Sequence, residues 1–286
     1  EISYAIPENK CINSPVVVGF GPAGMFASLL LARAGAKPIV LERGKAVEDR
    51  QADINKFFET GVLNTESNVQ FGEGGAGTFS DGKLTTNTKD FRHSFILKTF
   101  VEFGAPEEIL YEAKAHIGTD YLIKVVKNIR EFIKEKGGKF YFDTRFEGFG
   151  CENGKISRVI LSSKEVIETN LCILAIGHSA RDTFEMLYNN GVEMTQKPFA
   201  LGVRIEHKQS TINNSMFGFP DDRLGAANYK LTHTTTANRG VYSFCMCPGG
   251  FVVDSSSEEG GKVVNGMSYS KRDGENANSA IVVTVT

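Results

Sequence analysis

The 286-residue sequence predicts an α/β fold in which a parallel sheet carries an inserted antiparallel meander, followed by a second, mainly antiparallel part. Three observations support this fold class. Residues 16–42 run from an apolar strand through a glycine turn and an apolar helix to a second apolar strand. Residues 144–169 hold closely spaced strand-like segments separated by turn residues. After residue 197 the chain becomes rich in Gly, Ser, Thr and Asn, with short β-prone segments.

The first strand, turn and helix carry the pattern Gly-x-Gly-x-x-Gly, which is typical of dinucleotide-binding folds. Gly19 permits the tight turn, Gly21 lets the backbone approach a pyrophosphate, and Gly24 lets the helix pack closely on the sheet. Pro22 suits the first helical turn, where a missing N–H does no harm. Glu42 ends the second strand at the usual spacing of about 20 residues for an acid that accepts bonds from a ribose.

A second glycine-rich stretch, 69–84, is too rich in glycine for a regular helix or strand. Its backbone N–H groups, with Thr, Ser and Lys side chains, suit an anion or a flat ring. A flexible surface loop is the alternative.

The remaining segments are predicted from apolar periodicity and turn residues. We expect helices over about 22–34, 44–58, 91–103, 119–136 and 182–190. The meander is expected to contain four short strands, at 144–148, 150–154, 156–161 and 165–169. The continuous apolar run 171–177 predicts a strand buried on both faces of a parallel sheet. Two domains follow from this division, over residues 1–196 and 197–286.

Composition narrows the class of protein. A net charge of -2 offers no basic field for nucleic acid, so no nucleic-acid partner is expected. No apolar run is long enough to span a bilayer. Five scattered cysteines suit reduced thiols better than a disulfide framework, which favours a cytoplasmic protein. No metal site is expected, because His233 is the only further ligand near Cys245 and Cys247.

Several long motifs resemble those of the bacterial FAD-dependent oxidoreductases usually labelled NAD(FAD)-utilising dehydrogenases, at residues 19–26, 68–84, 116–120, 175–184 and 244–250. The resemblance extends from about Pro15 to the end of the chain. It also places the chain in the wider superfamily of flavoproteins similar to glutathione reductase and p-hydroxybenzoate hydroxylase. The fold it implies is a Rossmann-like FAD-binding domain with an inserted meander. That superfamily closes its flavin site with a late Gly-Asp or Gly-Glu segment, which is not found here, so we expect an incomplete second domain and a fragment.

Nucleotide choice follows from both arguments. The carboxylate of Glu42 disfavours a 2′-phosphate and hence NADP in this site, leaving FAD and NAD. The meander and the strand that ends at Gly177 favour FAD through the resemblance. NADH or NADPH is then expected only as a transient reductant, because no second complete Gly-x-Gly-x-x-Gly unit follows. The residues expected to bind the cofactor are Gly19, Gly21, Pro22, Ala23, Gly24, Glu42, Arg43, Arg50, Gly75, Ala76, Gly77, Thr78, Gly82, Leu84, Phe146, Ala175, Ile176, Gly177, His178 and Arg181.

Four residues are candidates for the chemistry. Lys83 is the best candidate for a charge near the reactive end of the flavin. The alternative is that Asp81 holds Lys83 in a structural ion pair. Cys245 and Cys247 alternate on a predicted strand, so both sulfurs could face one site as a redox dithiol. Buried free cysteines without a redox role are the more common case. Arg50 is open to a second interpretation as an exposed helix arginine.

Three functions remain open from the sequence. The first is a FAD-dependent oxidoreductase that transfers a hydride or electron pair to an unidentified small-molecule substrate. The second is a simple NAD-binding dehydrogenase. The third is a flavin-binding regulatory protein without turnover.

Overall fold

The computed structural model describes residues 5–8, 11, 13–80, 82–84, 86, 88–113, 115–219 and 222–285. Its N-terminal part is built on a parallel sheet with the strand order β3-β2-β1-β7. These strands are β1 (Val16–Val18), β2 (Ile39–Leu41), β3 (Lys139–Tyr141) and β7 (Cys172–Leu174). The parallel sheet predicted from the sequence is therefore present. Both β1 and β2 end at the edge where the glycine turn and Glu42 begin.

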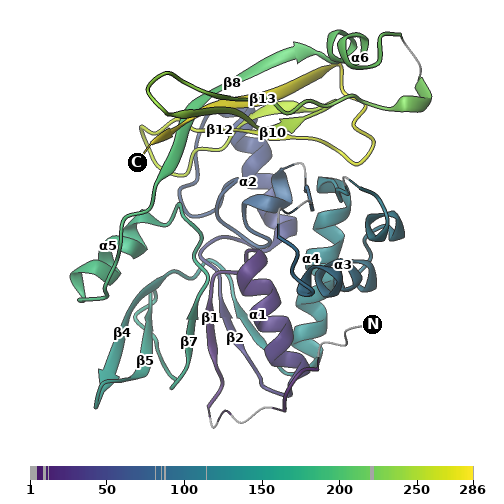
Figure 1. The fold of residues 1–286 in the computed structure, drawn as a ribbon. Helices are drawn as coiled ribbons and strands as arrows, with labels where there is room; N and C mark the ends of the chain where they lie inside the picture. Colours follow the sequence, from purple (N-terminus) through teal and green to yellow (C-terminus); the bar gives the residue numbers. More distant parts are fainter. Residues whose placement is uncertain are drawn as a thin grey trace.

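Helices pack on one side of this sheet (Figure 1). The main helices are α1 (Pro22–Arg33), α2 (Val47–Thr60), α3 (Arg92–Glu102) and α4 (Thr119–Glu135), with short 3-10 turns η1 (Ala76–Phe79) and η2 (Glu107–Leu110). The core between helices and sheet includes Phe20, Leu29, Val125 and Ile129. The apolar spacing that predicted α4 from the sequence matches the face that it buries.

An antiparallel meander covers the other side, formed by β4 (Phe146–Glu152), β5 (Lys155–Leu161) and β6 (Val166–Glu168). The predicted division of its first part into two strands is wrong. Residues 146–152 form one strand, whose register shifts between Phe146 and Gly148 and again between Gly150 and Cys151. A β-bulge absorbs such an irregularity without ending the strand. Asn153 and Gly154 form the turn between β4 and β5, with φ of 52° and 74°.

The strand predicted over 171–177 is shorter and more exposed in the structure than the sequence predicts. Only 172–174 is strand, and β7 pairs with β1 alone, at the edge of the sheet. Leu174 is 43% exposed, so the run is not buried on both faces. After Leu174 the chain stays close to β1 through the Ala175 N–H, which donates to Val18 O at 2.8 Å. It then turns at Gly177 (φ 69°) into α5 (Arg181–Asn189).

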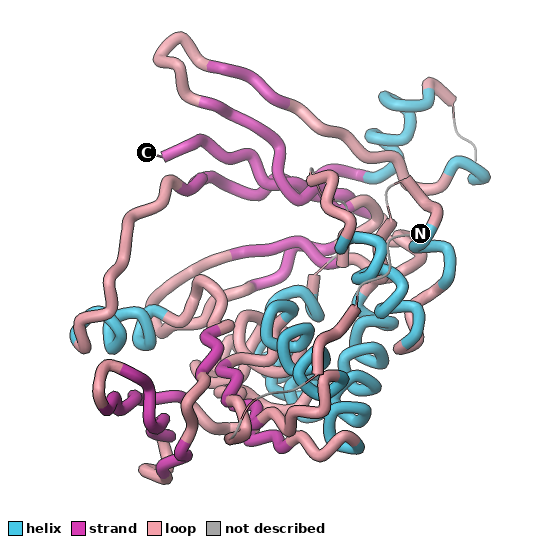
Figure 2. The backbone as a smooth tube through the Cα atoms, turned by 60° about the horizontal axis from the view of Figure 1, so that its bottom comes forward, coloured by secondary structure: helices cyan, strands magenta, loops and turns pink. Residues whose placement is uncertain are grey.

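The C-terminal part is mainly antiparallel, as predicted. Its larger sheet has the order β8-β13-β10-β9, and β11 pairs with β12 as a separate ribbon. The elements are β8 (Phe199–Lys208), α6 (Gln209–Phe217), η3 (Asp222–Leu224), β9 (Thr232–Thr234), β10 (Gly240–Cys247), β11 (Phe251–Asp254), β12 (Val264–Met267) and β13 (Asn276–Val285). Helix α6 was not predicted. The long strands form a group apart from the short strands of the N-terminal part (Figure 2).

Among the described residues, no helix combines the length and the apolar character needed to cross a bilayer.

Candidate functional site

The turn between β1 and α1 can only be made from glycine at two positions. Gly19 has φ 92°, and a Cβ there would lie 2.5 Å from the Ala175 carbonyl oxygen. A Cβ on Gly24 would lie 1.8 Å from the Gly19 carbonyl oxygen and 3.3 Å from the Ala175 Cβ. Gly24 therefore serves close packing between helix, turn and β7. It is not among the residues that line the cavity described below, so its predicted contact with the cofactor is not what the structure positions it for.

The N-terminus of α1 has no side-chain cap. Gly21 is the N-cap residue in an extended conformation, Pro22 follows it, and the first turn contains no acidic residue. The first N–H groups of a helix have no partner within the helix. With the positive end of the helix dipole, they form a site suited to an anionic group such as a phosphate.

The second glycine-rich stretch lies directly against this turn. The Gly74 N–H donates to Phe20 O at 2.8 Å, and a Cβ on Gly75 would lie 2.9 Å from the Gly21 Cα. The two glycine segments, 19–24 and 72–77, thus touch backbone to backbone. The alternative of a flexible surface loop is not what the structure shows, because Glu73, Thr78 and Phe79 are buried.

Arg50 of α2 holds the second segment in place. Its side chain is fully buried and donates to four backbone carbonyls, those of Asn68, Val69, Glu73 and Gly75, at 2.6–3.0 Å. Its guanidinium also lies 4.7 Å from the centre of the Phe79 ring. The interpretation of Arg50 as an exposed helix arginine is wrong, and its contact with the cofactor stays a prediction. Arg50 is not exposed, and its guanidinium is occupied beneath the loop and does not line the cavity.

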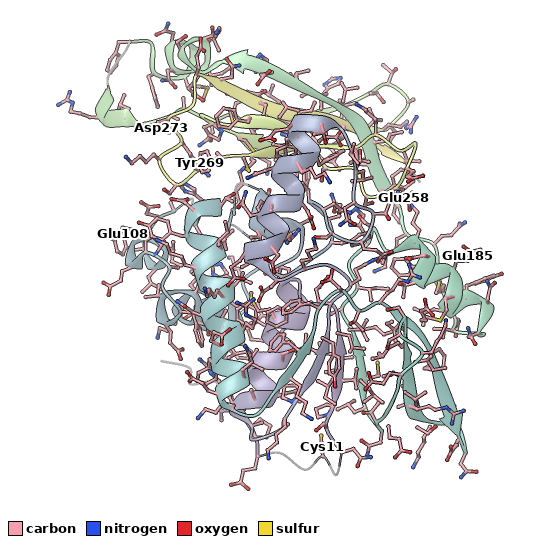
Figure 3. All side chains as sticks on the ribbon, turned by 180° about the vertical axis from the view of Figure 1, so that it is seen from behind. Cys11, Glu108, Glu185, Glu258, Tyr269 and Asp273 are labelled. Atoms are coloured by element: carbon pink, nitrogen blue, oxygen red, sulfur yellow. The ribbon has the colours of Figure 1, made fainter. Side chains whose placement is uncertain are left out.

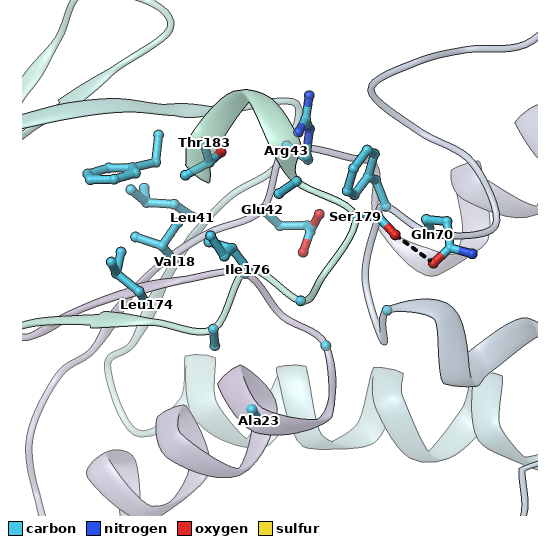
Figure 4. A pocket seen from close by; sticks show the side chains of 18 of the residues that line it. Val18, Ala23, Leu41, Glu42, Arg43, Gln70, Leu174, Ile176, Ser179 and Thr183 are labelled. Carbon is cyan, nitrogen blue, oxygen red and sulfur yellow. Dashed lines mark hydrogen bonds between the residues drawn. The ribbon is translucent and has the colours of Figure 1, made fainter. Parts of the chain in front are cut away.

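Glu42 is buried and ties the two glycine segments together. Its carboxylate accepts the Phe20 N–H at 2.8 Å, and the Gly44 and Gly72 N–H groups at 3.0 Å each. A carboxylate offers about four acceptor positions, so capacity for one further donor remains. Glu42 lines the cavity, where Figure 4 shows its carboxylate beside the glycine turn.

Arg43 belongs to an ionic cluster at the rim. Its guanidinium pairs with Glu66 at 3.0 Å and Asp182 at 2.9 Å, and lies 4.1 Å from the centre of the Phe71 ring. Burial lowers the pKa of Arg43, but the hydrogen bonds that Arg43 donates to Asp182 and Glu66, with the attraction of these two charges, outweigh burial and raise the pKa above its ordinary value. Within the first turn of α5, the Asp182 carboxylate also accepts the Thr183 N–H at 2.8 Å.

These elements enclose a cavity of about 590 Å³, which we call the glycine-turn cavity (Figure 4). Most predicted cofactor residues line it: Gly19, Gly21, Pro22, Ala23, Glu42, Arg43, Gly75, Ala76, Gly77, Phe146, Ala175, Ile176, Gly177 and His178. The sequence prediction missed Gln70, Ser179 and Thr183 among the lining residues. Gln70 accepts from Ser179 at 3.3 Å, and its amide nitrogen contacts Ser255 of the C-terminal part. Position next to a predicted motif was the one signal that pointed to them.

Other predicted cofactor residues lie elsewhere. Arg181 is 64% exposed and pairs at 2.7 Å with Glu258 of the C-terminal part, which Figure 3 labels. Thr78 is buried inside the loop, and Leu84 lines a different cavity beside α3. None of these three residues lines the glycine-turn cavity, and their contact with the cofactor stays a prediction.

A second cavity of about 730 Å³ adjoins the first at Gly77, which lines both. We call it the sheet-side cavity, because β10 and residues 228–230 form its far wall. Besides Gly77, the predicted residues Gly82, Lys83 and Cys245 line it. The Lys83 Nζ donates to the Cys247 Sγ at 3.6 Å, which brings together two residues far apart in the sequence. Asp81 lies outside the described residues.

The two cysteines do not share one face of a regular strand. Cys245 has φ 47°, and the pairing of β10 with β13 shifts between Phe244 and Cys247. The Cys247 Sγ contacts the Cys245 carbonyl oxygen at 3.3 Å, and neither cysteine is in a disulfide. A bulge breaks the alternation on which the dithiol hypothesis rested. Within the described part of the chain, no three His, Cys, Asp or Glu side chains gather as a metal site would require.

Sequence comparison finds a family to which the C-terminal part is similar. Residues 198–286 match the family described as "FAD-dependent protein, C-terminal domain-like", so this part is similar to FAD-dependent proteins. An uncharacterized protein of Clostridium beijerinckii is 57% identical over 275 residues, which cover 95% of this chain and 51% of that protein. The chain thus spans about half the length of this relative.

Solved structures show more distant similarity. An L-amino acid deaminase from Proteus vulgaris is 12% identical with a TM-score of 0.45, and the match covers 98% of this chain and 70% of the deaminase. A glycerol-3-phosphate dehydrogenase from Bacillus halodurans, complexed with FAD, is 12% identical with a TM-score of 0.42, covering 92% and 48% of the two chains. TM-scores of this size support no inference about activity.

Proposed function

We propose that this chain forms the FAD-binding portion, and part of the substrate domain, of a flavin-dependent oxidoreductase. The observation that carries the proposal is the contact between the two glycine segments at the uncapped start of α1, beside Glu42. The match of residues 198–286 to a FAD-dependent family supports the same cofactor independently. We further propose that the finer family is the one labelled NAD(FAD)-utilising dehydrogenases, and that the two domains are 1–196 and 197–286.

The residues present fit the ADP half of FAD. The backbone of Gly21 and Ala23 at the start of α1 would hold the pyrophosphate, because that end of the helix lacks any side-chain acceptor. Glu42 would accept a ribose hydroxyl with its remaining capacity. Arg43 and Phe146 would lie against the adenosine, since both line the same cavity.

The flavin end would lie near Gly77, where the two cavities meet. When bound, the flavin supplies hydride or electron-pair transfer, chemistry that no side chain offers alone. The chain's contribution there would be to orient the ring through the glycine-rich backbone and to place Lys83 beside it. Lys83 lines the sheet-side cavity and donates to the Cys247 sulfur. NADH or NADPH would act as a transient reductant.

Visible absorbance of the full-length protein tests the proposal. We expect protein incubated with FAD and then desalted to retain flavin absorbance, and protein incubated with NADH to show no comparable retention. Loss of all flavin from well-folded protein would overturn the proposal. Mixing flavin-loaded protein with NADH or NADPH in a stopped-flow instrument then identifies the reductant through bleaching of the flavin.

A glycine variant sharpens this test. A Cβ on Gly21 would lie 3.6 Å from the Gly75 Cα, an ordinary contact, so Gly21→Ala should fold normally. Its methyl group would stand where the backbone must approach the pyrophosphate. We expect Gly21→Ala to weaken FAD binding at least tenfold at unchanged Tm, measured by fluorescence titration. Equal FAD affinity in the variant would contradict the proposed pyrophosphate site.

A further inference from the structure

The sheet-side cavity has the composition of a site for an organic anion. Three basic residues line it: Lys83 from the glycine-rich stretch, Lys230 before β9 and Arg272 before β13. Among its lining residues that the structure describes, none is Asp or Glu. Cationic side chains that line a concave site with low-dielectric walls attract anionic ligands.

The same cavity has an apolar wall. Phe244, Met246 and Pro248 line it from β10 and the turn after it, and Phe244 is 60% exposed. An exposed aromatic ring beside cations suits a ligand that joins an apolar body to a charged group. The third feature is Tyr229, whose hydroxyl is hydrogen-bonded to the His207 Nε2 at 3.0 Å. That bond fixes the orientation of a polar group at the wall.

The sheet-side cavity shares a lining residue with the cavity proposed to bind the cofactor. Gly77 lines both cavities, so a ligand in the sheet-side cavity would lie next to whatever occupies the flavin end of the glycine-turn cavity. One wall of the sheet-side cavity comes from the N-terminal part and another from the antiparallel sheet. Sites between such parts are common positions for small-molecule substrates.

We propose that the sheet-side cavity binds the substrate of this protein and that the substrate is a small carboxylate with an apolar or aromatic body. That the ligand is a substrate rests on the proposed flavin function. The chemical class of the ligand rests on the lining residues alone. Arg272 would bind the carboxylate, since guanidinium matches its geometry in a bidentate pair. Lys83 and Lys230 would add attraction, and Phe244 would contact the apolar body.

Ligand titration tests this on the full-length, FAD-loaded protein. The probes are benzoate, its neutral counterpart benzamide, and inorganic phosphate, followed by calorimetry and by the shift in flavin absorbance. We expect saturable binding of benzoate, a perturbed flavin spectrum, and binding of benzamide and phosphate at least tenfold weaker. Losing one charge-assisted contact weakens binding by about tenfold or more, so Arg272→Met and Lys230→Met should each do so.

Lys262→Met is the matched control, because Lys262 is highly exposed on a different cavity. Each variant is accepted only if its flavin content and Tm equal those of the parent protein. Benzamide or phosphate binding as tightly as benzoate would overturn the carboxylate proposal while leaving the flavin function intact. Benzoate binding that both Met variants leave unchanged would also overturn it. A protein that takes up no FAD fails the proposed function instead, and calorimetry on that protein still tests the anion site.

Discussion

At the scale of single residues, Glu42 has two proposed roles: it holds three backbone N–H groups in place, and it binds the cofactor. Its carboxylate receives the N–H groups of Phe20, Gly44 and Gly72, which join the strand end to both glycine segments. In Glu42→Gln the amide nitrogen would face at least one of these donors, leaving a buried N–H unpaired. We expect at least tenfold weaker FAD binding and a lower Tm, measured by fluorescence titration and calorimetry. Glu59→Gln, exposed at the end of α2, is the control. FAD affinity equal to that of the parent protein would rule out a cofactor role for Glu42.

Glu73 makes stability depend on pH. Burial raises its pKa to about 7, although the Arg130 Nη1 lies 2.6 Å from one carboxylate oxygen. The folded state therefore binds a proton more tightly than the unfolded state between the ordinary pKa of 4.5 and about 7. Stability from this group is present below that window and is lost as the pH rises through it.

The expected loss is at most about 3 kcal/mol in the free energy of unfolding between pH 5 and pH 8. Urea unfolding at several pH values should show a decline for the parent protein and a flatter profile for Glu73→Gln. Glu108→Gln, exposed on η2, should keep the decline of the parent. Parallel profiles for the parent and Glu73→Gln would refute this assignment.

At the scale of elements, the contact between the glycine segments depends on Gly75. It has φ 63°, and a Cβ there would lie 2.9 Å from the Gly21 Cα and 3.3 Å from the Pro22 Cδ. Gly75→Ala should force the segments apart and weaken FAD binding, in addition to the strain of a left-handed residue. Gly35→Ala is a matched control, with φ 83° and no atom within 4 Å of the added Cβ. We expect both variants to lose stability, and Gly75→Ala alone to lose FAD affinity in a titration. Equal affinities would show that the contact between segments is not needed for binding.

Elements with a clear period were predictable from the sequence, and elements defined by their neighbours were not. The spacing of Leu122, Val125 and Ile129 specifies the buried face of α4 by itself. The exposure of Leu174 depends on β7 lying at a sheet edge, which the apolar run cannot reveal. Arg50 reads as a surface residue in a charged helix, and only the carbonyls of a distant loop explain its burial.

At the scale of the whole molecule, contacts between distant segments could not be predicted from the sequence, because they depend on neighbours that the local pattern does not specify. The contacts of Lys83 with Cys247 and of Gln70 with Ser255 join the second glycine-rich stretch to the C-terminal part. The irregularity at Cys245, which breaks the strand alternation between Cys245 and Cys247, depends on the pairing of β10 with β13. By contrast, the glycine motifs were predictable because their spacing encodes backbone geometry directly.

Gly77 is the position where the two parts of the molecule and both cavities meet. A Cβ there would have one neighbour within 4 Å, the Pro22 Cγ at 3.9 Å, so the fold itself does not require glycine. A larger side chain would extend into space shared by the proposed flavin and carboxylate sites. We therefore expect Gly77→Leu to keep the free energy of unfolding within about 1 kcal/mol of the parent, while both FAD and benzoate binding weaken at least tenfold. Val62→Leu, an exposed apolar exchange after α2, should change neither. If Gly77→Leu weakened only one of the two ligands, the flavin end and the anion site would not adjoin at this residue.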